Sequence, residues 1–326
     1  MIVGKSPLRI SLGGGGTDLP SYYRHHEGFV LAATIDKHVY VSLNSPFTDE
    51  FILKYSQSET VKTVDQIDHS IIRESIRHIS PGLKRLEVQS VADIPSGTGL
   101  GSSGAFTTAL VAALLELSGQ KISSELLAQH ACDIEIDLLN EPVGKQDQYA
   151  AAFGGINAFT FNRDDSVVVR PLAIEKEKTK ILDNSLSLFF TGFTRSASSI
   201  LKTQNQAAQS DDSKTIKFLD SIKEIGHSSE KAITSGDIDL LAELFLNHWQ
   251  LKKNGLSGAS NTDIDALYEV GINSGALAGK VVGAGGGGFL LFISKDKEKL
   301  NKGMASIGIH ETPFNLTSKG TEVYRV

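Results

Sequence analysis

Three glycine-rich segments constrain this chain more than any other feature of its sequence. They are Gly13 to Gly16, Gly97 to Gly104 and Gly283 to Gly288. Because glycine has no Cβ, such segments let the backbone turn sharply or lie directly against a ligand. The first two follow short apolar runs with the character of strands, and the second leads into the Ala- and Leu-rich run Ala105 to Leu117. The expected local order there is strand, glycine loop, buried helix.

Composition narrows the class of protein. The chain has 326 residues, 40% of them hydrophobic and 21% charged, which is typical of a globular protein with about two domains. The net charge of −6 makes nucleic acid an improbable main partner. A single cysteine, Cys132, excludes an intramolecular disulfide framework and fits a reducing compartment. No apolar run is long enough to span a membrane and Met1 to Arg9 has no signal-peptide core, so we expect a cytoplasmic protein without a membrane partner.

Strands and helices mix without regular alternation, which predicts an α+β fold rather than a doubly wound sheet. We place a domain boundary near residue 180, giving an N-terminal domain of residues 1–180 and a C-terminal domain of residues 181–326. Further elements are expected as follows: a helix from Ser123 to about Leu139, a helix beginning near Lys145, a buried strand Leu186 to Phe190, helices at about 196–208, 214–235, 238–254 and 263–274, and a hairpin around Val281 to Ile293.

The middle glycine segment carries the strongest signal for a ligand. A helix N-terminus leaves several backbone N–H groups unpaired and its dipole favours negative charge, so a phosphate group is the natural occupant. Ser102 and Ser103 would add hydroxyls for a phosphate or its Mg²⁺, whereas a Walker A motif is absent. The segment also matches G-x-G-x-x-G, which leaves a dinucleotide-binding alternative with Glu125 on the ribose. The candidate nucleotide-binding residues are Pro95, Gly97, Gly99, Leu100, Gly101, Ser102, Ser103 and Gly104.

Four charged residues could serve phosphoryl transfer to a hydroxyl group. Arg9 could stabilise charge on a transferring group, and Asp18 could accept hydrogen bonds from a polyol. Glu135 lies at the edge of an apolar helix stripe, and Asp147 follows in an irregular segment. These two carboxylates could converge with Ser103 on a Mg²⁺-nucleotide, Glu135 as a metal ligand and Asp147 as a base. The histidines show no spacing typical of a zinc site.

Taken in order, the three glycine segments resemble the motifs of the GHMP superfamily of small-molecule kinases, which includes galactokinases, homoserine kinases, mevalonate kinases and phosphomevalonate kinases. The resemblance implies an ATP- and Mg²⁺-dependent enzyme whose N-terminal domain is like the second domain of ribosomal protein S5 and whose C-terminal domain is ferredoxin-like. It implies that Asp147 and Arg9 are catalytic and that Ser103 and Glu135 bind Mg²⁺. Residues implied on the acceptor side are Gly14, Gly15, Gly16, Thr17, Asp18, Gly285 and Gly286.

One departure from the galactokinase pattern concerns the acceptor. Galactokinases have Glu-His before Thr-Asp where this chain has Gly15-Gly16, so a larger acceptor pocket is expected. The first motif and Thr191 to Leu201 look most like the D-glycero-D-manno-heptose 7-phosphate kinases, which phosphorylate the C1 hydroxyl of a sugar phosphate. Arg195, Lys5 and Arg24 are candidates to hold the distal phosphate. Fucose, galactose and mevalonate-type acceptors, a non-catalytic sugar or nucleotide sensor, and a homo-oligomeric state stay open.

Overall fold

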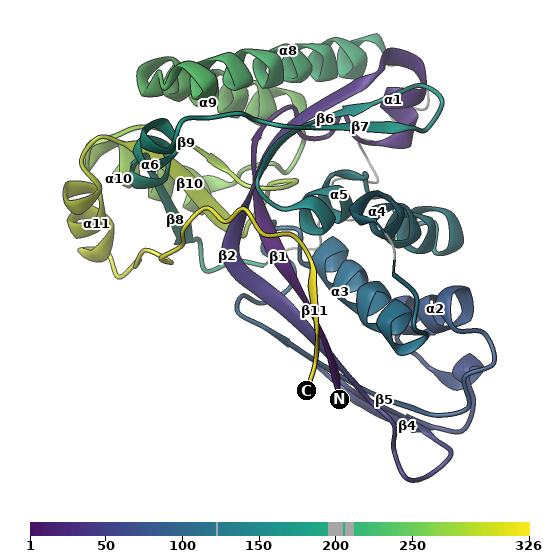
Figure 1. Cartoon of the computed structure of the whole chain (residues 1–326). Helices are drawn as coiled ribbons and strands as arrows, with labels where there is room; N and C mark the ends of the chain where they lie inside the picture. The colour runs from purple at the N-terminus through teal and green to yellow at the C-terminus, as the bar shows by residue number, and fades with distance from the viewer. Residues whose placement is uncertain (122, 195–204, 206–211) are drawn as a thin grey trace.

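The computed structural model describes residues 1–121, 123–194, 205 and 212–326, and the expected helix at about 196–208 and Arg195 lie outside them. Two β-sheets with helices packed on them form an α+β architecture (Figure 1), as the sequence predicts. Within the described residues the larger sheet has eight strands and the smaller one three. No helix in these ranges combines the length and apolar character that crossing a membrane requires.

The larger sheet consists almost entirely of strands from the first half of the chain. Its central neighbours are β1 (Ile2–Gly13) and the 17-residue β2 (Gly28–Asn44), which pair antiparallel. One part of β2 pairs with β6 and another part with β5, so this strand joins two regions of the sheet. The other strands are β3 (Phe51–Lys54), β4 (Ser58–Val61), β5 (Leu86–Ala92), β6 (Ile156–Phe161), β7 (Val167–Pro171) and β11 (Glu322–Arg325).

A buried helix, α3 (Ser102–Leu117), packs on β1 and β2 and forms the centre of the first core. It is apolar on nearly every side, because α2, α4 and α5 cover the faces that the sheet does not. The helices of this half of the chain are α1 (Pro20–His26), the 3₁₀ turn η1 (Val64–Gln66), α2 (Ser70–Ile79), α3, α4 (Ser124–Cys132), the π-helix η2 (Asp133–Leu138) and α5 (Gln146–Phe153).

The smaller sheet has the antiparallel strand order β8-β10-β9 and comes from the second half of the chain. Figure 1 shows α8 and α9 running side by side above both sheets, where α8 contacts β1 and β2 and α9 contacts β9. The larger hydrophobic cluster includes residues of both sheets, so the two halves share a core. The elements are α6 (Lys176–Ser185), β8 (Leu186–Phe190), α8 (Ser213–Ser235), α9 (Ile238–Gly255), α10 (Thr262–Asn273), β9 (Ala276–Val281), β10 (Phe289–Ser294) and α11 (Lys297–Ala305).

The periodic elements expected from the sequence are confirmed, including β8, α8, α9, α10 and the hairpin of β9 and β10. Two features differ from expectation. The predicted helix from Ser123 to Leu139 changes to a π-helix after Cys132, which turns both Ile134 and Glu135 inward. The last strand, β11, returns to the larger sheet beside β1, so that the two chain ends lie together in Figure 1. A domain division near residue 180 therefore stays a prediction.

Candidate active site

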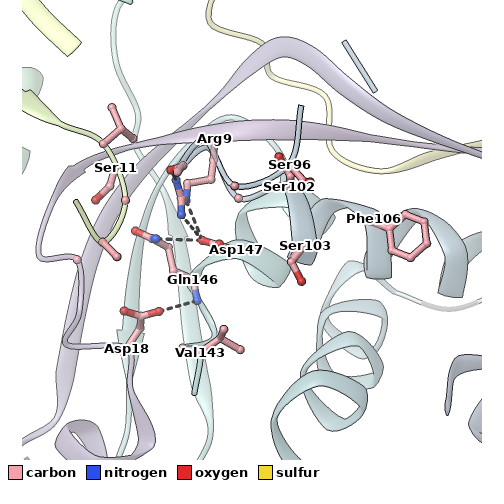
Figure 2. A pocket seen from close by; sticks show the side chains of 18 of the residues that line it. Arg9, Ser11, Asp18, Ser96, Ser102, Ser103, Phe106, Val143, Gln146 and Asp147 are labelled. Atoms are coloured by element: carbon pink, nitrogen blue, oxygen red, sulfur yellow. Dashed lines mark hydrogen bonds and ion pairs between the residues drawn. The ribbon is translucent and has the colours of Figure 1, made fainter. Parts of the chain in front are cut away.

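A cavity of about 580 Å³ lies where the two halves of the chain meet. Residues from three parts of the fold line it: the middle glycine segment with the start of α3, the first glycine segment with the start of α5, and a wall from α9 and β9. Figure 2 shows side chains of the first two parts, among them Ser102, Ser103, Asp18 and Asp147. The lining on these three walls includes Gly97, Gly99, Gly101, Ser102 and Ser103; Arg9, Ser11, Gly15, Gly16, Asp18, Gln146 and Asp147; and His248, Lys252, Lys280, Gly283 and Ala284.

The start of α3 presents its N-terminus and two hydroxyls to the cavity. Gly101 is the N-cap and has a positive φ of 80°. Residues other than glycine adopt this backbone conformation only with strain. Ser102 Oγ is buried and has no hydrogen-bond partner within the described ranges. Unpaired N–H groups, the helix dipole and these hydroxyls together suit an anionic phosphate chain.

The third glycine segment supports the middle one by direct backbone contact. A Cβ on Gly99 would lie 2.5 Å from the Val282 carbonyl oxygen, and one on Gly283 would lie 2.7 Å from the Gly99 carbonyl oxygen. Side chains at either position would force the two loops apart. Glycine is therefore required on both loops for the third glycine segment to pack against the middle one.

Arg9 and Asp147 meet at the centre of the cavity. Arg9 Nε donates to Asp147 Oδ1 at 2.8 Å and Arg9 Nη2 lies 2.7 Å from the same oxygen, while Nη1 donates to the Gly99 carbonyl at 2.6 Å. The backbone N–H of Arg9 also donates to the Leu100 carbonyl. Gln146 Nε2 donates to Asp147 Oδ1 as well, at 3.1 Å. These contacts orient Asp147 and leave its Oδ2 without a hydrogen bond to any described residue.

Glu135 lies behind Ser103 in the π-helix. Its side chain is 1% exposed, with Oε2 accepting from Ser103 Oγ and Oε1 accepting from Gln148 Nε2 at 3.0 Å. Burial raises the pKa of Glu135 to about 6, although the hydrogen bonds from Ser103, Thr107 and Gln148 oppose the shift. The carboxylate and the Ser103 hydroxyl therefore adjoin the start of α3 as a pair of hard oxygen ligands.

The first glycine segment closes the acceptor side of the cavity. Both carboxylate oxygens of Asp18 accept backbone N–H groups, from Gly16 at 3.0 Å and from Gln146 at 3.1 Å, and burial raises the pKa of this carboxyl. Asp18 thus ties the glycine turn to the start of α5. Thr17 Oγ1 lies 2.8 Å from the carbonyl oxygens of both Gly14 and Phe29, which share its one hydrogen, and holds the turn on β2.

Two buried polar atoms beside Gly15 have no partner within the described ranges. They are Ser11 Oγ and Gln146 Oε1, and a Cβ built on Gly15 would lie 3.2 Å and 3.9 Å from them. Buried polar groups normally have hydrogen-bond partners, and a pair of unsatisfied ones lining a cavity fits a hydroxylated ligand. The larger acceptor pocket stays a prediction, and the two polar atoms beside Gly15 are suited to the hydroxyl groups of a sugar.

Several predicted residues occupy other places. Arg24 pairs with Asp165 at 3.0 Å outside the cavity, and Lys5 lies in β1 between its neighbours Tyr40 and Glu322. Arg195 lies outside the described ranges. The remaining predicted residues serve as supports: Pro95 accepts from Thr98 through its carbonyl, Leu100 is fully buried, Gly104 packs against Asp147, and Gly285 and Gly286 pack against Ala259.

The sequence reasoning missed the third wall of the cavity. His248 and Lys252 are one turn apart on α9, and Lys280 precedes the third glycine segment on β9. The spacing of four residues between His248 and Lys252 was the available signal, since it places both on one helix face. Only packing of α9 on β9 brings Lys280 to them.

The glycine loops, the α3 N-terminus and the Arg9–Asp147 pair define a phosphotransferase site, and comparisons with known proteins agree. Residues 68–155 match the GHMP kinases N terminal domain and residues 229–308 the GHMP kinases C terminal family. The chain belongs to the GHMP kinases, enzymes that use ATP as phosphoryl donor, which decides against the dinucleotide-binding alternative. Within that family it is a sugar kinase, a phosphotransferase with an alcohol group as acceptor.

The chain matches two curated sugar kinases and one solved sugar kinase along nearly their whole length. The chain is 29% identical to the D-glycero-alpha-D-manno-heptose 7-phosphate kinase of Campylobacter jejuni, over 99% of this chain and 98% of that protein. It is 26% identical to the galactokinase of Thermosipho africanus, over 96% and 97% of the two chains. A crystal structure of a D-glycero-D-manno-heptose 1-phosphate kinase from Bacteroides thetaiotaomicron superposes with a TM-score of 0.83 and 26% identity, covering 100% and 99% of the chains.

Proposed function

We propose that this sugar kinase transfers the γ-phosphate of ATP to the C1 hydroxyl of D-glycero-D-manno-heptose 7-phosphate and so forms the 1,7-bisphosphate. The observation that carries the proposal is on the first glycine segment, where Ser11 Oγ and Gln146 Oε1, beside Gly15, are buried without a partner among the described residues. A sugar placed there would have hydroxyls to pair with both atoms. The two heptose kinases among the similar proteins support a heptose phosphate as acceptor.

The residues around Ser103 fit a magnesium ion. Ser103 Oγ and the Glu135 carboxylate are hard oxygen donors beside the α3 N-terminus, and the neighbouring Ser102 Oγ is buried with no partner in the part of the chain that the structure describes. Ser103 and Glu135 would hold the ion there. When bound, Mg²⁺ offsets the charge of the nucleotide phosphates.

Asp147 handles the acceptor proton in the proposed reaction. Its Oδ1 is held by Arg9 and Gln146, so Oδ2 is the oxygen available to the C1 hydroxyl. The hydroxyl oxygen forms a bond to the γ-phosphorus, the bond from that phosphorus to the β–γ bridging oxygen breaks, and the hydroxyl proton passes to Asp147. Arg9 stabilises negative charge on the transferring group, and the rigid setting of both residues supplies most of the catalysis by positioning.

The deciding experiment is coupled ADP release with ATP and Mg²⁺ over a panel of acceptors. The panel contains heptose 7-phosphate, heptose 1-phosphate, free heptose, galactose, fucose and mevalonate. We expect turnover confined to heptose 7-phosphate, and Asp147→Asn should lower kcat about 10³-fold or more while ATP still stabilises the protein against heat. Preferential turnover of a free sugar or of mevalonate would refute the heptose phosphate assignment, and an undiminished Asp147→Asn rate would refute the base.

Exposed Asp137, in the same half of the chain, provides a matched control for loss of a carboxylate. Asp137→Asn removes the same charge away from the Arg9 contact. Its kcat should equal that of the wild type, which separates loss of the base from a general effect of charge.

A further inference from the structure

Three basic side chains converge on the third wall of the cavity. His248, Lys252 and Lys280 are 7%, 6% and 2% exposed, and all three line the cavity that holds Arg9 and Asp147. Lys280 Nζ lies 3.3 Å from His248 Nδ1. Lys252 Nζ donates to the Val281 carbonyl at 3.3 Å and to the Gly283 carbonyl.

No carboxylate within the described residues forms an ion pair with any of these three groups. Buried charges normally have an opposite charge beside them, because desolvation of an isolated ion is costly. Lys280 Nζ also lies 4.2 Å from the centre of the Phe245 ring. Among the described residues, the hydrogen-bond partners of Lys252 Nζ are carbonyl oxygens. Burial lowers the pKa of all three groups, and neighbouring cations lower each further. The wall thus holds three basic groups with no ion-paired carboxylate among the described residues, and an anion bound beside them would favour their protonated forms.

The nucleotide has its own phosphate-binding features on a different wall. These are the middle glycine segment, the α3 N-terminus and the Ser103–Glu135 pair, all from the first half of the chain. The basic wall comes from α9 and β9 and adjoins the junction of Gly99 and Gly283, to which Arg9 is also bonded. An acceptor bound at Gly15 and Asp147 is thus bordered by this wall as well as by the nucleotide wall.

We propose that His248, Lys252 and Lys280 form a second anion site that binds the phosphate group already carried by the sugar acceptor. The inference rests on the proposed function. It assigns the selectivity for a phosphorylated sugar to a buried site instead of to the earlier candidates Lys5, Arg24 and Arg195. A dianionic phosphate supplies the charge that the wall lacks and accepts hydrogen bonds from the two ammonium groups. A free sugar leaves the wall uncompensated, so the enzyme discriminates against it.

Steady-state kinetics of Lys252→Met and Lys280→Met test the site. Methionine keeps the length of the side chain and removes the ammonium group, and thermal melting checks that each variant is folded. We expect the KM for heptose 7-phosphate to rise at least tenfold in each variant, with the KM for ATP changed less than threefold. The preference for heptose 7-phosphate over free heptose in kcat/KM should fall at least tenfold. Equal losses on both acceptors, or a raised KM for ATP, would overturn the inference and assign the lysines to the transferred phosphoryl group.

Lys253→Met is the matched control. Lys253 is the next residue of α9, is exposed, and pairs with Asp265 at 2.8 Å. Its substitution should leave the preference for the phosphorylated sugar intact, and loss of that preference would show that the effect does not depend on the cavity.

Direct binding of inorganic phosphate separates failure of this site from failure of the proposed function. The protein is first saturated with Mg²⁺ and a non-hydrolysable ATP analogue, which occupies the three nucleotide phosphate positions. Calorimetric titration with phosphate should show one site in the wild type, weakened at least tenfold in the Lys252→Met and Lys280→Met double variant. Absence of binding, or equal binding to both proteins, would refute the anion site whichever sugar the enzyme phosphorylates.

Discussion

Arg9 approaches Asp147 through two nitrogens at once, with Nε at 2.8 Å and Nη2 at 2.7 Å from the same oxygen, Oδ1. The third nitrogen, Nη1, donates to the carbonyl of Gly99 on the middle glycine segment. The planar guanidinium therefore joins Asp147 to the middle glycine segment and fixes their separation. The ammonium group of a lysine at the same place would make only part of these contacts.

Arg9→Lys should consequently lower kcat even though it keeps the positive charge. An ammonium group cannot bind Asp147 Oδ1 with two donors and Gly99 with a third, so we expect a fall in kcat of about 100-fold or more with a smaller change in the KM for ATP. Arg170→Lys is the control, because Arg170 is exposed and pairs with Glu230. Equal kcat values for Arg9→Lys and the wild type would show that charge alone is sufficient.

Glu135→Gln should stabilise the metal-free protein while reducing its activity. Since the pKa of Glu135 is raised from 4.5 to about 6, the contribution of this group to stability is complete below pH 4.5 and is lost as the pH rises through 6. The ionised form then costs about 2 kcal/mol above pH 6, which a neutral amide avoids. The denaturation midpoint should rise at pH 8 and not at pH 4.5, and kcat at pH 8 should fall at least tenfold.

Asp137→Asn serves as the control for Glu135→Gln, since it removes an exposed carboxylate from the same π-helix. It should change neither kcat nor the difference in stability between the two pH values. A gain in stability for Glu135→Gln that is the same at pH 4.5 and pH 8 would contradict the ionisation argument.

Ser11→Ala should affect the acceptor alone. Ser11 Oγ is buried without a partner in the described residues, so its removal has little effect on folding, whereas a lost hydrogen bond to the sugar raises the acceptor KM about tenfold. Ser187 Oγ in β8 is a second buried, unpartnered hydroxyl and does not line the cavity, so Ser187→Ala is the control. Similar acceptor KM values in both variants would mean that Ser11 does not contact the sugar.

The acceptor KM should rise with pH above neutrality. Burial and the charge of Arg9 lower the pKa of Lys252 to about 7. The basic groups that line the cavity with it are His248 on the same helix, Arg9 on β1 and Lys280 on β9. An anionic acceptor binds the protonated lysine better, so its KM should increase by up to about tenfold per pH unit between pH 7 and 9. In Lys252→Met this dependence should be flat, and a slope retained in that variant would assign it to another group.

Local sequence determined the elements that carry the chemistry. The glycine segments, the helix after Ser102 and the position of Asp147 at the start of a helix follow from residue types and their spacing, because loops, caps and periodicity act over a few residues. The amphipathic helices α8, α9 and α10 were predictable for the same reason.

Contacts between distant parts of the chain were decided only by the tertiary structure. Arg9 meets Asp147 across 138 positions of sequence, and no local pattern states which face of β1 points to that carboxylate. Glu135 turns inward in a π-helix that packs against α2 and α3, two elements distant from it in sequence. Lys252 and Lys280 resemble surface lysines in the sequence, and they become a buried pair only when α9 packs on β9. Side-chain burial results from such packing, and it is set by the whole fold rather than by the neighbouring residues in the sequence.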